Sequence, residues 1–148
     1  MILILLLIAY AAYANQLPTS EMSLNGISPG ASMDYIKGIY GEPQLLRSNS
    51  GEKTYSYGGT LFLRTIQYGN SHESVTFVES TANNGFSTPA GVTVGIKVSE
   101  LFDLYGPEEL QVNSNSETFY HYTRRESGSG ITMLIFVTGN RISAIRIF

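Results

Sequence analysis

The clearest candidate for a reactive residue is Ser28 in the segment GISPG, residues 26 to 30, which has the G-x-S-x-G spacing of a serine nucleophile. Such a serine needs a strand before it, a long helix after it, and an acid and a histidine further along. Here a polar segment precedes Ser28, and the similar segment GVTVG, residues 91 to 95, has Thr93 in its place. The pattern therefore favours a structural hydroxyl in a turn or cap over a nucleophile.

The remaining groups that could do chemistry are scattered. His72 lies beside the predicted turn at Gly69 and Asn70, and His121 stands alone between two tyrosines. No His, Asp and Glu residues share the spacing of a metal site, and no two carboxylates form a recognisable glycosidase pair. We expect no catalytic activity, no metal and no cofactor.

Composition narrows the class further. The net charge is −3, only 14% of residues are charged, and no run of Lys or Arg suggests nucleic-acid binding. The chain has no cysteine, so it has no disulfide framework. Residues 1–14, MILILLLIAYAAYA, have the apolar run and A-x-A ending of a secretory signal peptide, although a buried N-terminal strand or helix is the alternative. We expect an exported protein that is secreted, periplasmic or associated with the cell envelope, and that has no transmembrane span in its mature part.

The sequence contains an internal similarity. Residues 26–43 align with residues 91–108 at a constant offset, and the alignment continues into a Y-x-Y segment in each copy. Six glycines form its signature: Gly26, Gly30 and Gly41 in the first copy, and Gly91, Gly95 and Gly106 in the second. The alignment predicts an N-terminal linker at 15–23, a first repeat at 24–78, a linker at 79–90 and a second repeat at 91–148.

Each copy shows the same order of elements. Apolar residues at helical spacing predict short helices over 33–40 and 98–105, with Ser32 as a side-chain N-cap and Gly41 in the left-handed region after the first helix. Strands are expected at 44–48, 53–58, 61–68, 74–78, 110–113, 117–124, 131–138 and 142–148. Short turns require antiparallel pairing. The fold class is therefore α+β, in two tandem units, each a helical segment packed on a four-stranded antiparallel sheet with one open face.

The segments ISPGASMDYIKGIYG and VTVGIKVSELFDLYG, each followed by Y-x-Y, resemble the repeat of the beta-lactamase inhibitor proteins (BLIP). They are also similar to envelope lipoproteins of the SmpA/OmlA (BamE) type. The resemblance implies two α2β4 units whose sheets form one concave, aromatic-lined surface that grips an enzyme. The inhibitors carry one disulfide per unit and use Trp on that surface, whereas this chain has neither Cys nor Trp. The resemblance thus bears more on the fold than on the target.

Tyrosines are the candidate partner-binding residues. Alternation along a strand places each Y-x-Y pair on one sheet face without saying which. The resemblance favours the open face over the core. The candidates are Tyr55, Tyr57, Tyr68, Tyr120, Tyr122 and Phe136. We expect a non-catalytic, monomeric, inhibitor-like module that binds another protein through its open sheet face. The alternatives are an envelope assembly factor of the SmpA/OmlA type and a binder of cell-wall glycan.

Overall fold

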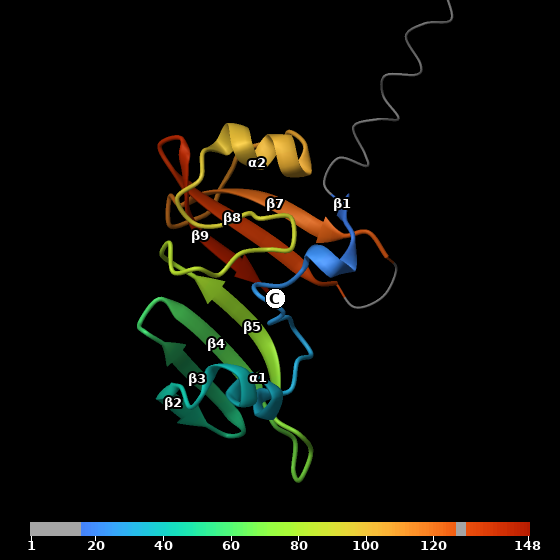
Figure 1. Cartoon of the computed structure of the whole chain (residues 1–148), viewed down its shortest axis with the longest axis vertical. Helices are drawn as coiled ribbons and strands as arrows, with labels where there is room; N and C mark the ends of the chain where they lie inside the picture. The colour runs from blue at the N-terminus through green and yellow to red at the C-terminus, as the bar shows by residue number, and fades with distance from the viewer. Residues whose placement is uncertain (1–15, 127–129) are drawn as a thin grey trace, which may run out of the picture.

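A computed structural model describes residues 16–126 and 130–148 (Figure 1). The described elements, in chain order, are β1 (Gln16–Leu17), a 3-10 turn (Thr19–Glu21), α1 (Met33–Tyr40), β2 (Gln44–Asn49), β3 (Glu52–Tyr57), β4 (Leu61–Ile66), β5 (Ser74–Ser80), α2 (Val98–Tyr105), β6 (Gln111–Val112), β7 (Thr118–Arg124), β8 (Thr132–Thr138) and β9 (Arg141–Ile147). The predicted signal peptide lies outside the described residues. Neither of the two described α-helices has the length and apolar character of a bilayer span.

The strands form one mixed sheet of nine strands in the order β1-β7-β8-β9-β5-β4-β3-β2, with β6 also paired to β7. Among the described strands, β1 and β7 form the one parallel pair. The α+β class is confirmed, but the prediction of two separate four-stranded units is wrong. β5 pairs with β9 through Val78↔Ile147, Glu79↔Arg146 and Ser80↔Ile145, which joins the strands on either side into a continuous sheet. This pairing satisfies backbone groups that two separate sheets would leave as unpaired edges.

Both helices span their predicted ranges, but their ends differ from expectation. Ser32 occupies the N-cap position of α1 without a side-chain cap hydrogen bond. The N–H of Met33 instead donates to the backbone oxygen of Glu73, at 2.9 Å. Gly41 follows α1 with φ +80° and ψ −172°, so its φ is positive as expected but its ψ is extended rather than left-handed helical. Residues with a side chain rarely adopt this backbone conformation, which explains why glycine occupies position 41.

One face of the sheet is covered by the two helices and by the loops around residues 22–31 and 86–96, which lie in front of the strands in Figure 1. Met33 and Ile36 from α1 and Leu101 from α2 are fully buried there. They pack with inward-facing strand residues such as Leu63 and Ile135 in one hydrophobic cluster. The core of the protein is therefore this single layer between the helices and the sheet.

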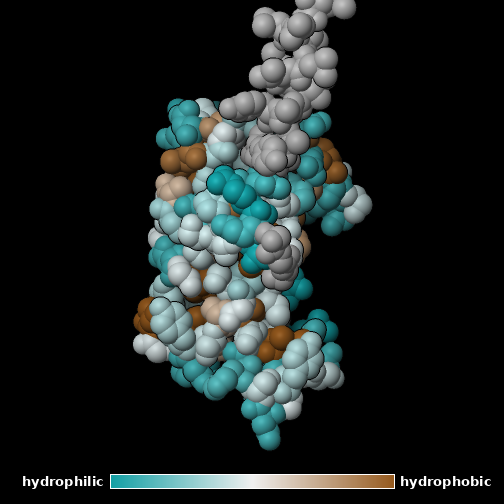
Figure 2. Space-filling view, turned by 90° about the vertical axis from the view of Figure 1, so that its right-hand side faces the viewer, coloured by the Kyte–Doolittle hydropathy of each residue, from teal (hydrophilic) through white to brown (hydrophobic). Residues whose placement is uncertain are grey.

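The other face carries no covering element within residues 16–126 and 130–148. Figure 2 shows the molecule from the side. Its right-hand outline, opposite the helix layer, is concave at mid-height. We call this uncovered side the open face. Its side chains are the ones that alternate with the buried set along each strand.

Candidate functional site

The tyrosines of the two Y-x-Y segments do not lie on the open face. Tyr55, Tyr120 and Tyr122 are 5%, 8% and 0% exposed and belong to the core beneath the helices, and Tyr57 is half-buried against the same core. Their register explains this placement, because Tyr55 is opposite Leu63 and Tyr120 is opposite Ile135, both fully buried. Three of these rings are core residues and Tyr57 packs against the core, so the four rings do not form a surface on the open face.

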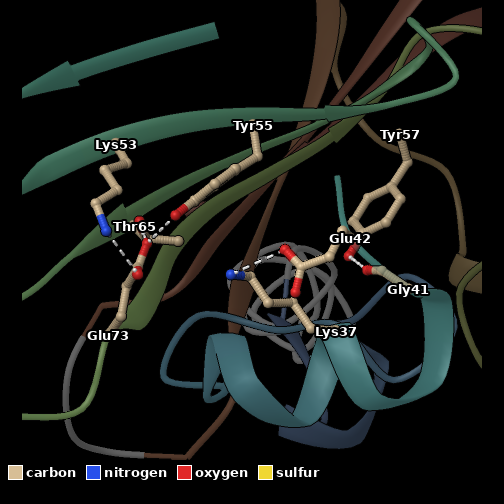
Figure 3. A network of polar contacts seen from close by, with 8 residues as sticks. All are labelled: Lys37, Gly41, Glu42, Lys53, Tyr55, Tyr57, Thr65 and Glu73. Carbon is tan, nitrogen blue, oxygen red and sulfur yellow. Dashed lines mark hydrogen bonds and ion pairs between the residues drawn. The ribbon is translucent and has the colours of Figure 1, made fainter. Parts of the chain in front are cut away.

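Tyr55 belongs to a polar cluster around the Glu73 carboxylate (Figure 3). Glu73 Oε1 accepts hydrogen bonds from Tyr55 Oη at 2.8 Å and from Thr65 Oγ1 at 2.6 Å. Glu73 Oε2 pairs with Lys53 Nζ at 3.1 Å. Glu73 stands just before β5, whereas its three partners come from β3 and β4. The cluster therefore ties three neighbouring strands together under the start of α1.

The pKa values of this cluster indicate a structural role. Burial opposes ionisation of Glu73, but hydrogen bonds from Thr65, Tyr55 and Lys53 outweigh it and hold its pKa below the ordinary value. Burial, together with the hydrogen bond to Glu73, raises the pKa of Tyr55 to about 12. At neutral pH the carboxylate is thus charged and fully used as an acceptor, and the phenol stays protonated.

The second tyrosine of each segment binds the end of a helix. Tyr57 Oη donates to the backbone oxygen of Gly41 at 2.7 Å, and Tyr122 Oη donates to that of Gly106 at 3.3 Å. These oxygens lie just after α1 and α2, where helix carbonyls lack intrahelical partners. Burial raises the pKa of the Tyr122 hydroxyl, so it remains a donor. Both hydroxyls hold helix ends onto the sheet.

The two other aromatic candidates have different positions. Tyr68 is 73% exposed just beyond the end of β4, away from the centre of the sheet. Phe136 does lie on the open face, since it is opposite Phe119 and Ala144 and alternates with buried Ile135. It is itself only 5% exposed, because the guanidinium of Arg146 lies 4.6 Å from the centre of its ring and the Phe119 ring packs beside it at 5.6 Å.

The open face is organised around stacked arginines and phenylalanines. The Arg64 guanidinium lies 3.9 Å from the centre of the Phe77 ring, and Arg146 lies 5.6 Å from the same ring. Arg146 Nε also binds Glu79 Oε2, its cross-strand neighbour. Phe148 stacks against Phe77 with centroids 6.5 Å apart. These five residues, from β4, β5, β9 and the position after β9, are called the Arg–Phe cluster.

Three shallow depressions follow the open face across the Arg–Phe cluster. One of about 250 Å³ is lined by Arg64, Thr76, Phe77, Arg146 and Phe148. A second, of about 170 Å³, lies toward β2 and β3 and is lined by Arg47, Asn49, Glu52, Lys53, Thr54, Arg64, Thr65 and Thr76. A third, of about 550 Å³, lies toward β7 to β9 and includes Glu79, Glu117, Phe136 and Arg146. The Arg–Phe cluster therefore connects depressions from both parts of the sheet.

Sequence reasoning missed the Arg–Phe cluster although part of its signal was present. Arg64 stands between Leu63 and Thr65, and Arg146 stands between Ile145 and Ile147. The neighbours of each arginine along its strand are therefore apolar or small residues that suit the buried face. That pattern places both arginines on the solvent side. The pairing of β5 with β9, which brings Arg146 to Phe77, has no local signal in the sequence.

The candidates for catalysis remain apart. Ser28 lies in the loop before α1, where its backbone oxygen accepts from Ala31, and His72 is exposed in the loop before β5. His121 is half-buried on the open face, opposite Leu134 on β8. Within residues 16–126 and 130–148, no group of three or more metal-ligating side chains comes together.

The signature glycines occupy turns and helix ends. All six have positive φ, between +80° and +100°: Gly26, Gly30, Gly41, Gly91, Gly95 and Gly106. Gly30 N donates to Val75 O and Gly95 N donates to Ile142 O, each at 2.8 Å, so the segment before each helix is bonded to a strand. These contacts give the glycines a structural role.

The candidate site is thus a sheet face, uncovered in the described part of the chain, on which the Arg–Phe cluster connects three depressions. Comparisons with protein-family models, curated proteins and solved structures gave no match to this chain.

Proposed function

We propose that this chain is a non-catalytic, exported protein-binding module that holds another protein against its open sheet face. The observation that carries the proposal is the Arg–Phe cluster on a sheet face with no covering layer in the described part of the chain. Arginine and aromatic residues are enriched in protein interfaces, because they bury a large area for few rotatable bonds and offer directed donors.

The polar character of the open face favours a partner that associates reversibly. Its large apolar side chains are partly covered, with Phe77 at 9% exposure beneath two guanidiniums. A permanent interface is more apolar than this. We therefore propose a separately folded partner that associates with a stable, monomeric chain.

Tyrosine contacts on the helix-covered side are alike in the two parts of the chain. Tyr57 and Tyr122 occupy equivalent places in the alignment, and each donates to the glycine that follows its helix. Tyr40 packs edge-on against Tyr57, and Tyr105 packs edge-on against Tyr122. These four rings therefore serve the contact between helices and sheet, which supports assigning the partner to the other, open face.

A cell-wall glycan is a second candidate ligand, because the depression of about 550 Å³ is lined by hydroxyl and carboxylate groups. Sugar rings, however, are commonly held on an exposed aromatic face, and Arg146 covers Phe136 here. An assembly role in the envelope, as in proteins of the SmpA/OmlA type, would use the same open face to bind a protein and is a special case of the proposal.

Site-specific photo-crosslinking tests the proposal. A benzoylphenylalanine replaces Phe148 on the open face and, as a matched control, Tyr35 on the outer side of α1; both are exposed aromatic residues, at 44% and 61%. In the native envelope fraction we expect a discrete protein adduct from position 148 and none from position 35. Adducts from position 35 alone, or the same diffuse adducts from both positions, would refute the open-face proposal.

A further inference from the structure

The Phe77 ring is bracketed by two guanidinium groups whose electrostatic situations differ. Arg146 is neutralised by Glu79, which lies directly opposite it on the neighbouring strand. Arg64 is exposed and stacks on the same ring, but no carboxylate in the described part of the chain forms an ion pair with it. Arg146 therefore has a carboxylate partner, whereas Arg64 has none among the described residues.

The surroundings of Arg64 reinforce this imbalance. Two arginines, Arg47 and Arg64, and one carboxylate, that of Glu52, line the adjoining depression of about 170 Å³. Lys53 also lines it, but its ammonium is paired with Glu73 on the helix-covered side and adds no uncompensated charge here. Arg47 and Arg64 flank Thr54 in one cross-strand row, so two arginines face the same side of the sheet. This region is positive on a chain whose overall charge is −3.

Stacking prepares Arg64 to bind an acid. A guanidinium that lies flat on an aromatic ring loses part of its freedom before any partner arrives, while its N–H edge remains directed away from the ring. The planar fork matches the two oxygens of a carboxylate. Arg64 is therefore better suited to a partner's carboxylate than an unstacked surface lysine would be.

The depression beside Arg64 limits the size of the group that can bind there. The depression of about 250 Å³ is smaller than the roughly 300–1,000 Å³ of small-molecule pockets. One wall is Phe148, which is 44% exposed and presents an apolar surface next to the guanidinium. The depression has room for one or two side chains, of which one is acidic and one apolar.

We propose that Arg64 receives the carboxylate of an Asp or Glu side chain of the partner protein, and that an adjacent apolar side chain of that partner packs on Phe148. The inference rests on the proposed function, since it identifies the chemistry of the partner at the same open face. In the complex, the partner's acid does for Arg64 what Glu79 does for Arg146.

Peptide selection on the purified chain tests this inference. Random peptides displayed on phage are selected on the wild-type chain, and the enriched sequences are synthesised for titration against variants. We expect an Asp or Glu next to an apolar residue as the shared feature. The Kd of such a peptide should rise by about tenfold or more with Arg64→Gln, as expected for the loss of a hydrogen bond between charged groups.

Two controls separate charge from folding. Lys97→Gln removes one positive charge at the start of α2, on the helix side, and should leave the peptide Kd within about twofold, as expected for a distant surface charge. Arg64→Glu should reject the acidic peptide but bind its Lys-for-Glu version more tightly than the wild type does. Restoration by the reversed pair cannot arise from a damaged fold.

The outcomes distinguish this inference from the function on which it rests. Peptides whose binding is lost with Phe148→Ser but is unchanged with Arg64→Gln would overturn the role of Arg64 and leave the open-face function standing. Enriched peptides without an acidic residue would do the same. If no enriched peptide responds to either change, both the inference and the proposed function fail.

Discussion

Replacement of Glu73 by Gln tests whether the polar cluster around Glu73 stabilises the fold. In the wild type, Glu73 accepts from Tyr55 and Thr65 at 2.8 and 2.6 Å and pairs with Lys53 at 3.1 Å. Glutamine keeps one acceptor oxygen but turns an N–H₂ group toward the ammonium of Lys53. Hydrogen bonds to a charged group contribute about 1.5–3 kcal/mol each, and part of this survives in the amide, so we expect a loss of about 2–3 kcal/mol in the free energy of unfolding at pH 7.

The pH dependence of that loss is the sharper measurement. Because the pKa of Glu73 in the folded chain lies below its ordinary value of 4.5, the stabilisation is complete above that value and disappears as the pH falls through the folded pKa. Urea denaturation of wild type and Glu73→Gln from pH 7 to pH 3 should show two stabilities that converge on acidification.

Glu42→Gln provides the matched control. Glu42 pairs with Lys37 at 3.2 Å, but its side chain is 78% exposed, so we expect a change of at most about 0.5 kcal/mol. A loss of unfolding free energy below about 1 kcal/mol for Glu73→Gln, or a loss of equal size at pH 7 and pH 3, would refute the role of Glu73 as a charged acceptor.

Three further changes test other parts of the fold. Tyr122→Phe removes the hydroxyl that donates to Gly106 and should cost about 1 kcal/mol in urea denaturation, whereas a neutral result would mean that this bond does not hold α2. Gly51→Ala should destabilise the chain by more than about 1 kcal/mol by thermal unfolding, because φ is +86° and a Cβ would stand 2.7 Å from the backbone oxygen of Gln67; an unchanged midpoint would contradict this. Tyr68→Ser should leave stability within about 0.5 kcal/mol, since the ring is 73% exposed, and a larger loss would reveal a packing role.

Local structure was predictable from this sequence because its signals are local. The apolar stripe from Met33 to Tyr40 and the positive-φ glycine at 41 fix α1 within one segment, and the turn residues at 69 and 70 separate two strands. The β5–β9 pairing was not predictable in the same way. Its partners, such as Val78 and Ile147, are apolar residues that would serve equally well in two separate sheets.

The candidate site shows the same limit. Alternation correctly groups Tyr55 with Tyr57, but the choice of face depends on what each hydroxyl meets. The acceptors are Glu73 for Tyr55 and the carbonyl of Gly41 for Tyr57, and only the folded chain brings them into reach. Tyrosines were expected on the open face, whereas arginines stacked on phenylalanines occupy it.

The two edges of the sheet have opposite properties, and this limits how copies of the chain can associate. β1 and β6 both pair with the outer side of β7, whereas β2 has no strand on its outer side in the described part of the chain and all six of its residues are exposed. An assembly that grew edge to edge would need two free edges on each copy. Pairing of β2 with the β2 of another copy would use the same six-residue edge on both molecules, in a two-fold contact. The opposite edge offers only β1 and β6, of two residues each, and such short edge strands disfavour edge-to-edge growth into a fibre.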